Sequence, residues 1–330
     1  MPDRRHRVLI APDSFKGTFT AVQVAEALGE GFASAGIAID LCPLADGGEG
    51  TVAALVPSQN LVFVDTVDPL GRPIRAAYGL SGDTAYVECA AASGLTLVEP
   101  EDRDASTAST FGTGLLIADA VARGSRRIVV ACGGSATTDG GLGCLAAIEA
   151  AGGLRSADVI VLTDVTLPFE EAAVWFAPQK GADPAEVAAL TQRLHQTASG
   201  LPKDPRGVEG SGAAGGLAGG LWAAHDASIV SGAGYVLDAL EVGTRVESSS
   251  LVVTGEGRID EQTFHGKLVG ELARRCQAAG VPCVAVVGRD ELGRDRGTDL
   301  GLADIVQASS RLELVDTARR LARQLTEESP

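Results

Sequence analysis

Residues Ala131–Gly143 read A-C-G-G-S-A-T-T-D-G-G-L-G, and this stretch decides how the middle of the chain is expected to fold. The apolar run at 128–131 predicts a strand, and the Ala/Leu-rich run at 142–151 predicts a helix. Five glycines, three hydroxyls and one carboxylate lie in the stretch. Such a loop either presents N–H groups to an anion at a helix N-terminus or only allows close backbone packing. The loop alone leaves both interpretations open.

The composition indicates a globular protein of two domains, because the chain has 330 residues and is 45% hydrophobic. A net charge of −16 argues against nucleic acid and anionic membrane surfaces as partners. The six cysteines show neither C-x-x-C nor zinc spacing, which favours reduced thiols. No uncharged apolar stretch is long enough to span a bilayer. We therefore expect a cytoplasmic protein, either a monomer or a homodimer.

Strand and helix patterns alternate at both ends of the chain. Near the N-terminus two strand patterns flank a helix whose capping box is Thr20–Gln23. Near the C-terminus three more strand patterns alternate with helices. The five predicted strands are residues 7–11, 39–42, 251–254, 281–287 and 303–307. They predict an α/β fold with a flavodoxin-like parallel-sheet domain made of residues 1–60 and 248–330.

The intervening residues 61–247 are predicted to be a second, inserted α/β domain with a mixed sheet. It begins with three short apolar runs separated by turn residues, at 61–67, 74–80 and 84–89, which predict an antiparallel meander. The strand and helix on either side of the glycine-rich stretch come next. A helix with the capping box Asp183–Glu186 follows later.

Four loops that follow predicted strands carry acids, hydroxyls, glycines and lysines. Open α/β sheets bind ligands at the carboxyl ends of their strands, so these loops are candidate site loops. Paired carboxylates beside glycines suit Mg²⁺ or proton acceptance. The alternative is that they form turns and cap helices. The loops contain Asp13 to Lys16, Asp46 to Glu49, Ser135 to Asp139, and Glu256 to Lys267.

The residue types favour phosphoryl transfer over nucleophilic hydrolysis. None of the four histidines lies in a recognisable Ser/His/Asp or Cys/His pattern. Only four lysines occur, and three of them adjoin a glycine: Lys16, Lys180 and Lys267. Phosphoryl transfer needs a carboxylate for Mg²⁺, cations or N–H groups for the phosphates, and a base for the acceptor hydroxyl. The chain supplies each of these without a Walker motif.

The ordered motifs resemble those of the bacterial type I glycerate kinases over roughly residues 7–325. The resemblance implies ATP-dependent phosphorylation of D-glycerate, typically at the 2-hydroxyl, by a protein with one flavodoxin-like and one inserted domain. The motifs that carry it are A-P-D-S-F-K-G, A-D-G-G-E-G-T, D-P-L-G-R-P, E-C-A-A-A-S-G-L, G-G-S-A-T-T-D-G-G-L-G, P-Q-K-G-A, G-A-A-G-G-L and T-G-E-G-R-I-D-E-Q-T.

On this hypothesis the site lies in a cleft between the two domains and uses ATP and Mg²⁺. The residues expected to bind the nucleotide phosphates are Gly133, Gly134, Ser135, Thr137, Asp139, Gly140 and Gly141. The expected catalytic residues are Lys16, Asp46, Asp260 and Lys267, with Asp46 and Asp260 as alternative Mg²⁺ ligands or proton acceptors. The residues expected near the acceptor substrate are Asp13, Ser14, Glu49 and Glu256.

Two departures from the family pattern leave alternatives open. Residues 164–171 read D-V-T-L-P-F-E-E, a shortened version of the family's segment, and Leu268 follows Gly266-Lys267 where the family often has proline. The alternatives are a kinase for another small hydroxy acid, and a non-catalytic relative that binds a nucleotide or metabolite. A panel of substrates separates the first, and binding without turnover identifies the second.

Overall fold

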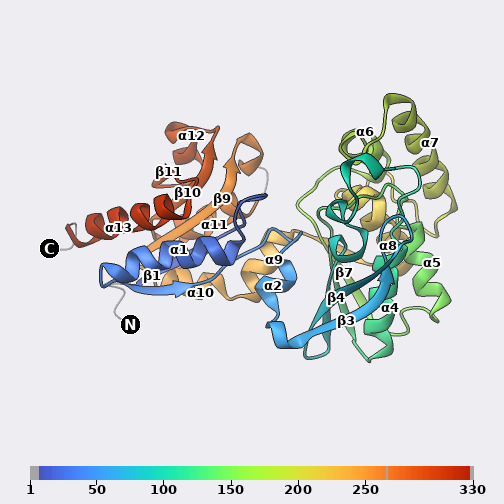
Figure 1. The fold of residues 1–330 in the computed structure, drawn as a ribbon, viewed down its shortest axis with the longest axis horizontal. Helices are drawn as coiled ribbons and strands as arrows, with labels where there is room; N and C mark the ends of the chain where they lie inside the picture. The colour runs from blue at the N-terminus through green and yellow to red at the C-terminus, as the bar shows by residue number, and fades with distance from the viewer. Residues whose placement is uncertain (1–6, 265–266, 328–330) are drawn as a thin grey trace. The chain divides into compact units, whose positions relative to one another are not determined.

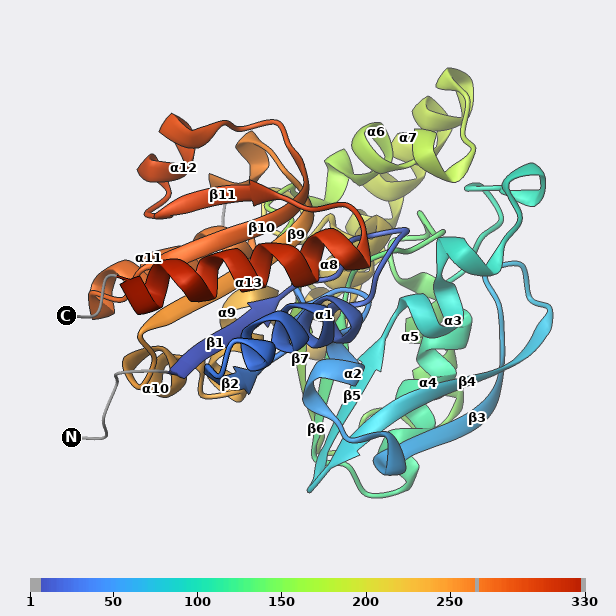
Figure 2. The same ribbon diagram turned by 60° about the vertical axis from the view of Figure 1, so that its left-hand side comes forward.

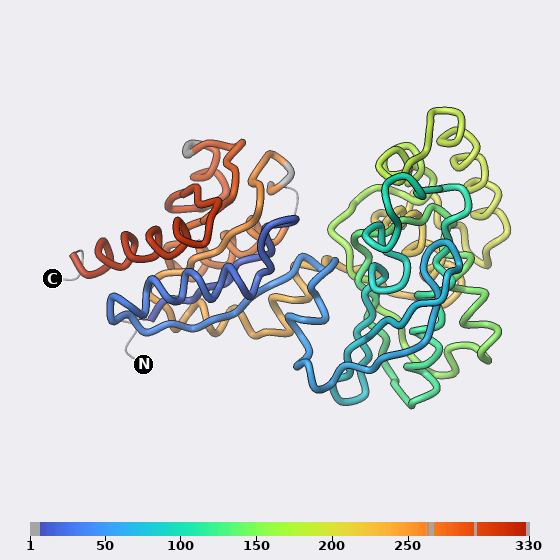
Figure 3. Tube along the Cα trace, viewed as in Figure 1, coloured from blue at the N-terminus to red at the C-terminus, as the bar shows by residue number. Residues whose placement is uncertain are grey.

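The computed structural model describes residues 7–264 and 267–327 (Figure 1). The chain divides into two compact units. The parallel-sheet unit comprises Met1–Asp46 and Ala233–Pro330, and the inserted unit comprises Gly47–Gly232. Figure 3 follows the trace through both, with the blue N-terminal part and the orange-to-red C-terminal part in the parallel-sheet unit.

This division differs from the predicted boundaries at residues 61 and 247. The N–H groups of Gly50 and Val52, at the start of α2 (Thr51–Leu55), donate to the Glu88 carboxylate at 3.0 and 2.8 Å. Glu88 ends β5 (Thr84–Glu88), so α2 is attached to the inserted sheet. A change of hydrophobic period marks where the meander begins, but it cannot show on which sheet a preceding helix packs.

The sheet of the parallel-sheet unit has the order β11-β10-β9-β1-β2, and all its strand pairs are parallel. Counted along the chain this is the flavodoxin-like order, which confirms the predicted fold class. From β1 the chain adds β2 on one side and β9, β10 and β11 on the other, so a crevice is expected at the carboxyl ends of β1 and β9. The strands are β1 (Arg7–Pro12), β2 (Ala38–Leu41), β9 (Leu251–Ile259), β10 (Cys283–Asp290) and β11 (Asp304–Gln307).

Helices α1 (Ala21–Ser34) and α13 (Arg311–Glu327) pack side by side in this unit (Figure 2). The predicted capping box of Thr20 and Gln23 begins α1. Val8, Ile10 and Val253 lie in one buried cluster with Leu28 of α1 and Leu314 of α13. The remaining helices of this unit are α9 (Gly232–Ala239), α10 (Val242–Glu247), α11 (Leu268–Ala279) and α12 (Arg294–Asp299).

The prediction of a loop directly after Thr254 is wrong, because β9 continues to Ile259. Its glycines permit close approach of neighbouring backbone. A Cβ on Gly255 would lie 2.2 Å from the carbonyl oxygen of Val286, and one on Gly257 would lie 3.1 Å from the backbone nitrogen of Lys16. Glycine in a strand has this function where another backbone comes close.

The inserted unit has a six-stranded mixed sheet in the order β3-β4-β5-β6-β7-β8. The first three strands are antiparallel, as the predicted meander requires, and the later pairs are parallel. The short strand β8 was not predicted. The strands other than β5 are β3 (Leu61–Val67), β4 (Pro73–Ser81), β6 (Arg127–Ala131), β7 (Asp158–Leu162) and β8 (Ser228–Val230).

Helices α4 and α5 pack against each other, and Leu116, Ile117, Cys144 and Ile148 from this pair belong to the core cluster of the sheet. Within the described ranges no helix is long and apolar enough to cross a membrane. The helices of this unit besides α2 are α3 (Ala90–Ser93), α4 (Phe111–Ala122), α5 (Leu142–Ala150), α6 (Ala172–Phe176), α7 (Pro184–Gly200) and α8 (Leu217–His225).

Gly31 sets the spacing between α1 and α13, because a Cβ there would lie 2.4 Å from the carbonyl oxygen of Val315. We expect Gly31→Ala to lower the free energy of unfolding, although alanine is otherwise favoured over glycine in helices by ~1 kcal/mol. Gly243 in α10 is the matched control, since a Cβ there meets nothing within 4 Å. Gly243→Ala should stabilise the protein slightly. Urea unfolding measures both, and equal effects would contradict the packing account.

Candidate functional site

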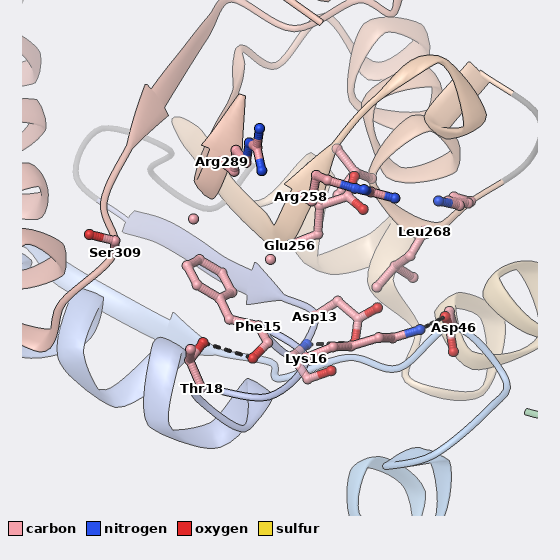
Figure 4. A pocket seen from close by; sticks show the side chains of 15 residues that line it. Asp13, Phe15, Lys16, Thr18, Asp46, Glu256, Arg258, Leu268, Arg289 and Ser309 are labelled. Atoms are coloured by element: carbon pink, nitrogen blue, oxygen red, sulfur yellow. Dashed lines mark hydrogen bonds and ion pairs between the residues drawn. The ribbon is translucent and has the colours of Figure 1, made fainter. Parts of the chain in front are cut away.

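A cavity of about 570 Å³ opens in the parallel-sheet unit at the carboxyl ends of its strands (Figure 4). Side chains reach it from the loops after β1 and β2, from the ends of β9 and β10, from the start of α11, and from Ser309. The position between β1 and β9 is the point where open α/β sheets bind ligands. The fold therefore places a pocket where the topology predicts one.

The loop after β1 is held by its own hydrogen bonds. The N–H of Asp13 donates to the carbonyl of Gly255 at 2.8 Å, which extends the pairing of β1 with β9. Phe15 and Phe19 exchange backbone hydrogen bonds of 2.8 and 3.1 Å, and the Thr18 hydroxyl donates to the Phe15 carbonyl at 2.9 Å. The turn is fixed in this way, and Asp13 and Phe15 are buried against the strand ends.

Two carboxyl groups of the cavity have pKa values near neutrality. Burial raises the pKa of Asp13 from 3.8 to about 7, and the negative charge of Asp46 adds to the rise. Burial also raises the pKa of Glu256 to about 7, against the lowering effect of Lys267 and of a hydrogen bond that the Thr263 hydroxyl donates at 3.1 Å. Groups of this kind can hold or release a proton under physiological conditions.

Four cationic side chains line the same cavity: Lys16, Arg258, Lys267 and Arg289. Lys16 Nζ donates to Asp46 Oδ2 at 3.1 Å, and Figure 4 shows this contact as a dashed line. Asp260 lies 3.7 Å from the Lys267 ammonium and 3.2 Å from the Arg258 guanidinium. The lysines and arginines give the cavity enough positive charge for an anionic ligand.

The structure brings much of the predicted site together within this one unit. The predicted site residues that line the cavity are Asp13, Ser14, Lys16, Asp46, Glu256 and Lys267, and Asp260 is tied to them by its ion pair with Lys267. Arg258 and Arg289 were not predicted. Their signal is in the sequence, because each directly follows a glycine at the end of a strand, as Lys16 and Lys180 precede one. The roles of all these residues stay predictions.

The other predicted residues belong to the inserted unit, where the glycine-rich loop meets the segment Gly47–Glu49. A Cβ on Gly133 would lie 2.7 Å from the Cα of Gly48, and one on Gly134 would lie 3.8 Å from a carboxylate oxygen of Glu49. Gly134 is exposed and Gly133 is half-buried. This part of the loop remains accessible to a ligand.

The second half of the loop is buried and bonded to the protein. The Asp139 carboxylate accepts from the Thr110 N–H at 2.8 Å, the Thr110 hydroxyl at 2.9 Å, the Gly141 N–H at 3.0 Å and the Gly143 N–H at 3.1 Å. Thr110 precedes α4 and Gly141 precedes α5, so one carboxylate serves two helix N-termini.

Neighbouring positions of the loop are also packed into the protein. The Gly140 N–H donates to the Gly215 carbonyl at 3.0 Å, and a Cβ on Gly215 would lie 1.9 Å from the carbonyl oxygen of Thr137. Both interpretations of the loop therefore have a physical basis. Residues 133–134 can face a ligand, whereas 137–143 connect helices and strands. That Thr137, Asp139, Gly140 and Gly141 bind phosphate stays a prediction.

A further buried cation beneath the loop was not predicted to belong to the site. Lys180, from the P-Q-K-G-A motif, donates to the Ser135 hydroxyl oxygen at 3.1 Å and to the Thr137 carbonyl at 2.5 Å. Burial lowers its pKa from 10.5 to about 8. The sequence did offer a signal, since lysine is rare in this chain and adjoins glycine here.

Among the described residues, no group of three or more His, Cys, Asp or Glu side chains is arranged to hold a metal ion by itself. Kinases do not need such a cage, because Mg²⁺ binds through one or two carboxylates together with substrate phosphates. Asp46 fits that role, since it is partly exposed in the cavity and its charge already disfavours ionisation of Asp13. A divalent cation would relieve this repulsion.

The fold and the cavity define a two-unit α/β protein with an acidic and cationic pocket suited to a small anionic ligand. The sequence matches the model of the glycerate kinase family over residues 8–152 and 149–329. The chain belongs to the glycerate kinase family.

Similar proteins agree with this assignment. A glycerate kinase of Bacillus subtilis is 38% identical over 323 residues, covering 86% of this chain and 85% of that one. A glycerate 2-kinase of Escherichia coli K12 is 36% identical, covering 87% of each chain. A crystal structure described as a glycerate kinase 2 of Salmonella typhimurium LT2 superposes with a TM-score of 0.83 at 34% identity, covering 98% of each chain.

We expect Asp139→Ala to reduce the free energy of unfolding more than the loss of a single exposed helix cap. Two helix N-termini lose their acceptor, and a single N-cap is typically worth ~1 kcal/mol. The matched control is Asp183→Ala, which removes the exposed capping box of α7. Chemical unfolding of both variants provides the comparison. A smaller loss for Asp139→Ala than for Asp183→Ala would refute the double-capping role.

Proposed function

We propose that this protein phosphorylates D-glycerate with ATP and Mg²⁺ and forms 2-phosphoglycerate. The observation that carries the proposal is the cavity at the β1/β9 crevice, which combines two buried carboxyls of raised pKa with four cationic side chains. Glycerate offers a carboxylate for the cations and a hydroxyl for a base. Family membership favours this acceptor over other hydroxy acids.

Asp13 is the general base in this proposal. Asp13 is 7% exposed and lines the cavity, and its carboxyl has a pKa of about 7, near the pH at which a base works best. Asp46 and Asp260, the proton acceptors expected from sequence, each form an ion pair with a lysine. Asp13 accepts the hydroxyl proton as the acceptor oxygen bonds to the γ-phosphorus and the bond to ADP breaks.

The lysines and arginines hold negative charge during transfer. Both lysines line the cavity, and each ammonium is held there by its own ion pair, Lys16 with Asp46 and Lys267 with Asp260. Arg289 reaches the cavity from the end of β10, where it pairs with Glu291 at 2.9 Å and can also bind the glycerate carboxylate. Electrostatic stabilisation of this kind provides most of the catalysis in phosphoryl transfer.

Mg²⁺ would be held by Asp46 together with nucleotide phosphates, and when bound it neutralises charge on the β- and γ-phosphoryl oxygens. The accessible Gly133 and Gly134 of the glycine-rich loop, together with the adjoining Ser135, are assigned to the nucleotide phosphates. Its glycines leave the backbone open to a ligand, and helix N-termini and neighbouring N–H groups favour anions.

The product identifies the reaction. After incubation with D-glycerate and Mg·ATP we expect the phosphorus NMR signal of 2-phosphoglycerate, together with one ADP for each product molecule. L-glycerate, lactate and glycolate serve as comparison acceptors. Faster turnover of one of these would make the protein a kinase of another hydroxy acid. ATP binding without any turnover would make it a non-catalytic relative.

The pH dependence identifies the base. Because Asp13 must be ionised to accept a proton, we expect kcat/KM to rise with pH through about 7 and to level off above it. Asp13→Asn should lower kcat by ~10²–10⁴ and abolish this rise.

The matched variant for this test is Glu256→Gln, since Glu256 has a similarly raised pKa in the same cavity. If the Glu256→Gln enzyme loses the rise with pH while Asp13→Asn retains it, the base is Glu256. The two pH–rate profiles are measured with saturating Mg²⁺, so that metal binding does not enter the comparison.

A further inference from the structure

Lys180 is a buried cation that the mechanism above does not use. Lys180 is 2% exposed, and neither of its two hydrogen bonds goes to a carboxylate. Burying an ammonium without a counter-ion is costly, and the cost is offset only by good hydrogen bonds. Lys180 makes two of them, both to the glycine-rich loop, at Ser135 Oγ and at the Thr137 carbonyl.

These bonds determine what the Ser135 hydroxyl can do. A lysine ammonium donates and never accepts, so the Ser135 oxygen accepts from Lys180 and its own proton must point elsewhere. That proton has no acceptor among the described residues. The hydroxyl is therefore a spare donor beside the accessible glycines of the loop.

The backbone on both sides of Ser135 is fixed as well. The Leu95 N–H donates to the Gly134 carbonyl at 2.8 Å, and the Ala136 N–H donates to the Ser93 carbonyl at 2.9 Å. Only the side chain of Ser135 is therefore free to rotate, and its hydrogen bond with the Lys180 ammonium determines its orientation. The positive charge adds to the attraction of this segment for an anion, because screening is weak in the interior.

We propose that Lys180 is a positioning residue for the nucleotide: it fixes Ser135 so that the serine hydroxyl donates a hydrogen bond to a phosphate oxygen of ATP. This rests on the proposed function only in assigning Gly133 to Ser135 to the phosphates. Lys180 touches no substrate and acts through Ser135.

The test is a double-mutant cycle of Ser135→Ala and Lys180→Met, in which the apolar methionine keeps the length of the lysine side chain. The KM for ATP, the KM for D-glycerate and the Kd for ADP by calorimetry are measured for both single variants and for the double variant. Lys203→Met is the matched control, because Lys203 belongs to the same unit but is exposed and paired with Asp226.

We expect each single variant to raise the KM for ATP and the Kd for ADP ~10-fold, which is typical of a lost hydrogen bond to a charged group. The double variant should be no worse than Lys180→Met, since both changes remove one interaction. The KM for D-glycerate and all constants of Lys203→Met should stay at wild-type values. A merely structural lysine would lower the melting temperature without this pattern.

Additive effects in the double variant, or equal rises in the KM of both substrates, would overturn the proposal. If Lys180→Met does not fold, Ser135→Ala decides alone, and an unchanged KM for ATP together with an unchanged Kd for ADP contradicts the role of the hydroxyl. Failure of the proposed function is distinguishable. If the wild-type protein binds ADP but never phosphorylates glycerate, the proposed function is refuted. The Kd values for ADP in the double-mutant cycle still test the role of Lys180 in that case.

Discussion

The close approach of backbones at the carboxyl ends of β1, β9 and β10 is the constraint on which the cavity depends. Glycines occupy each contact, and a Cβ on Gly288 would lie 2.7 Å from the carbonyl oxygen of Gly257. With Gly255 and Gly257 they allow the loop that carries Asp13 and Lys16 to lie directly against two strands. Larger side chains at these positions would separate Asp13 from the cations, so the proposed chemistry of the site depends on residues that take no part in it.

The cavity also illustrates how one unit holds acids and cations together without neutralising all of them. Each lysine of the cavity pairs with an aspartate, whereas Asp13 and Glu256 are kept near their titration points by burial. Because the lysines form their ion pairs with Asp46 and Asp260, the buried carboxyls of Asp13 and Glu256 can still gain or lose a proton near neutral pH. The same division of roles recurs wherever neighbouring carboxyls in one site differ in environment.

The sequence predicts those features of the fold and of the site that depend on interactions between residues close together in the chain. Local patterns correctly predicted the flavodoxin-like order, the meander and both capping boxes, because periodicity and caps act within a few residues. Gly255 to Ile259 was misjudged as a loop because the partner that demands glycine, β10, is distant in sequence. That Asp139 binds phosphate stays a prediction, and no local pattern reveals that its carboxylate meets the N-termini of two helices. The rarity of lysine singles out Lys180 in the sequence, but only the fold shows that its ammonium donates to the Ser135 hydroxyl oxygen.

The buried carboxyl of Asp13 links the folding of the protein to proton uptake. Its pKa is raised from 3.8 to about 7, so between these values the folded chain binds a proton that the unfolded chain has released. The contribution of this group to the free energy of unfolding is therefore largest at low pH and declines as the pH rises from 3.8 towards 7. Above pH 7 the whole contribution has been lost. The protein is least stable, as far as this group is concerned, in the ionisation state that a base requires. On the proposed mechanism, the ionised Asp13 that accepts the proton also lowers the free energy of unfolding of the protein.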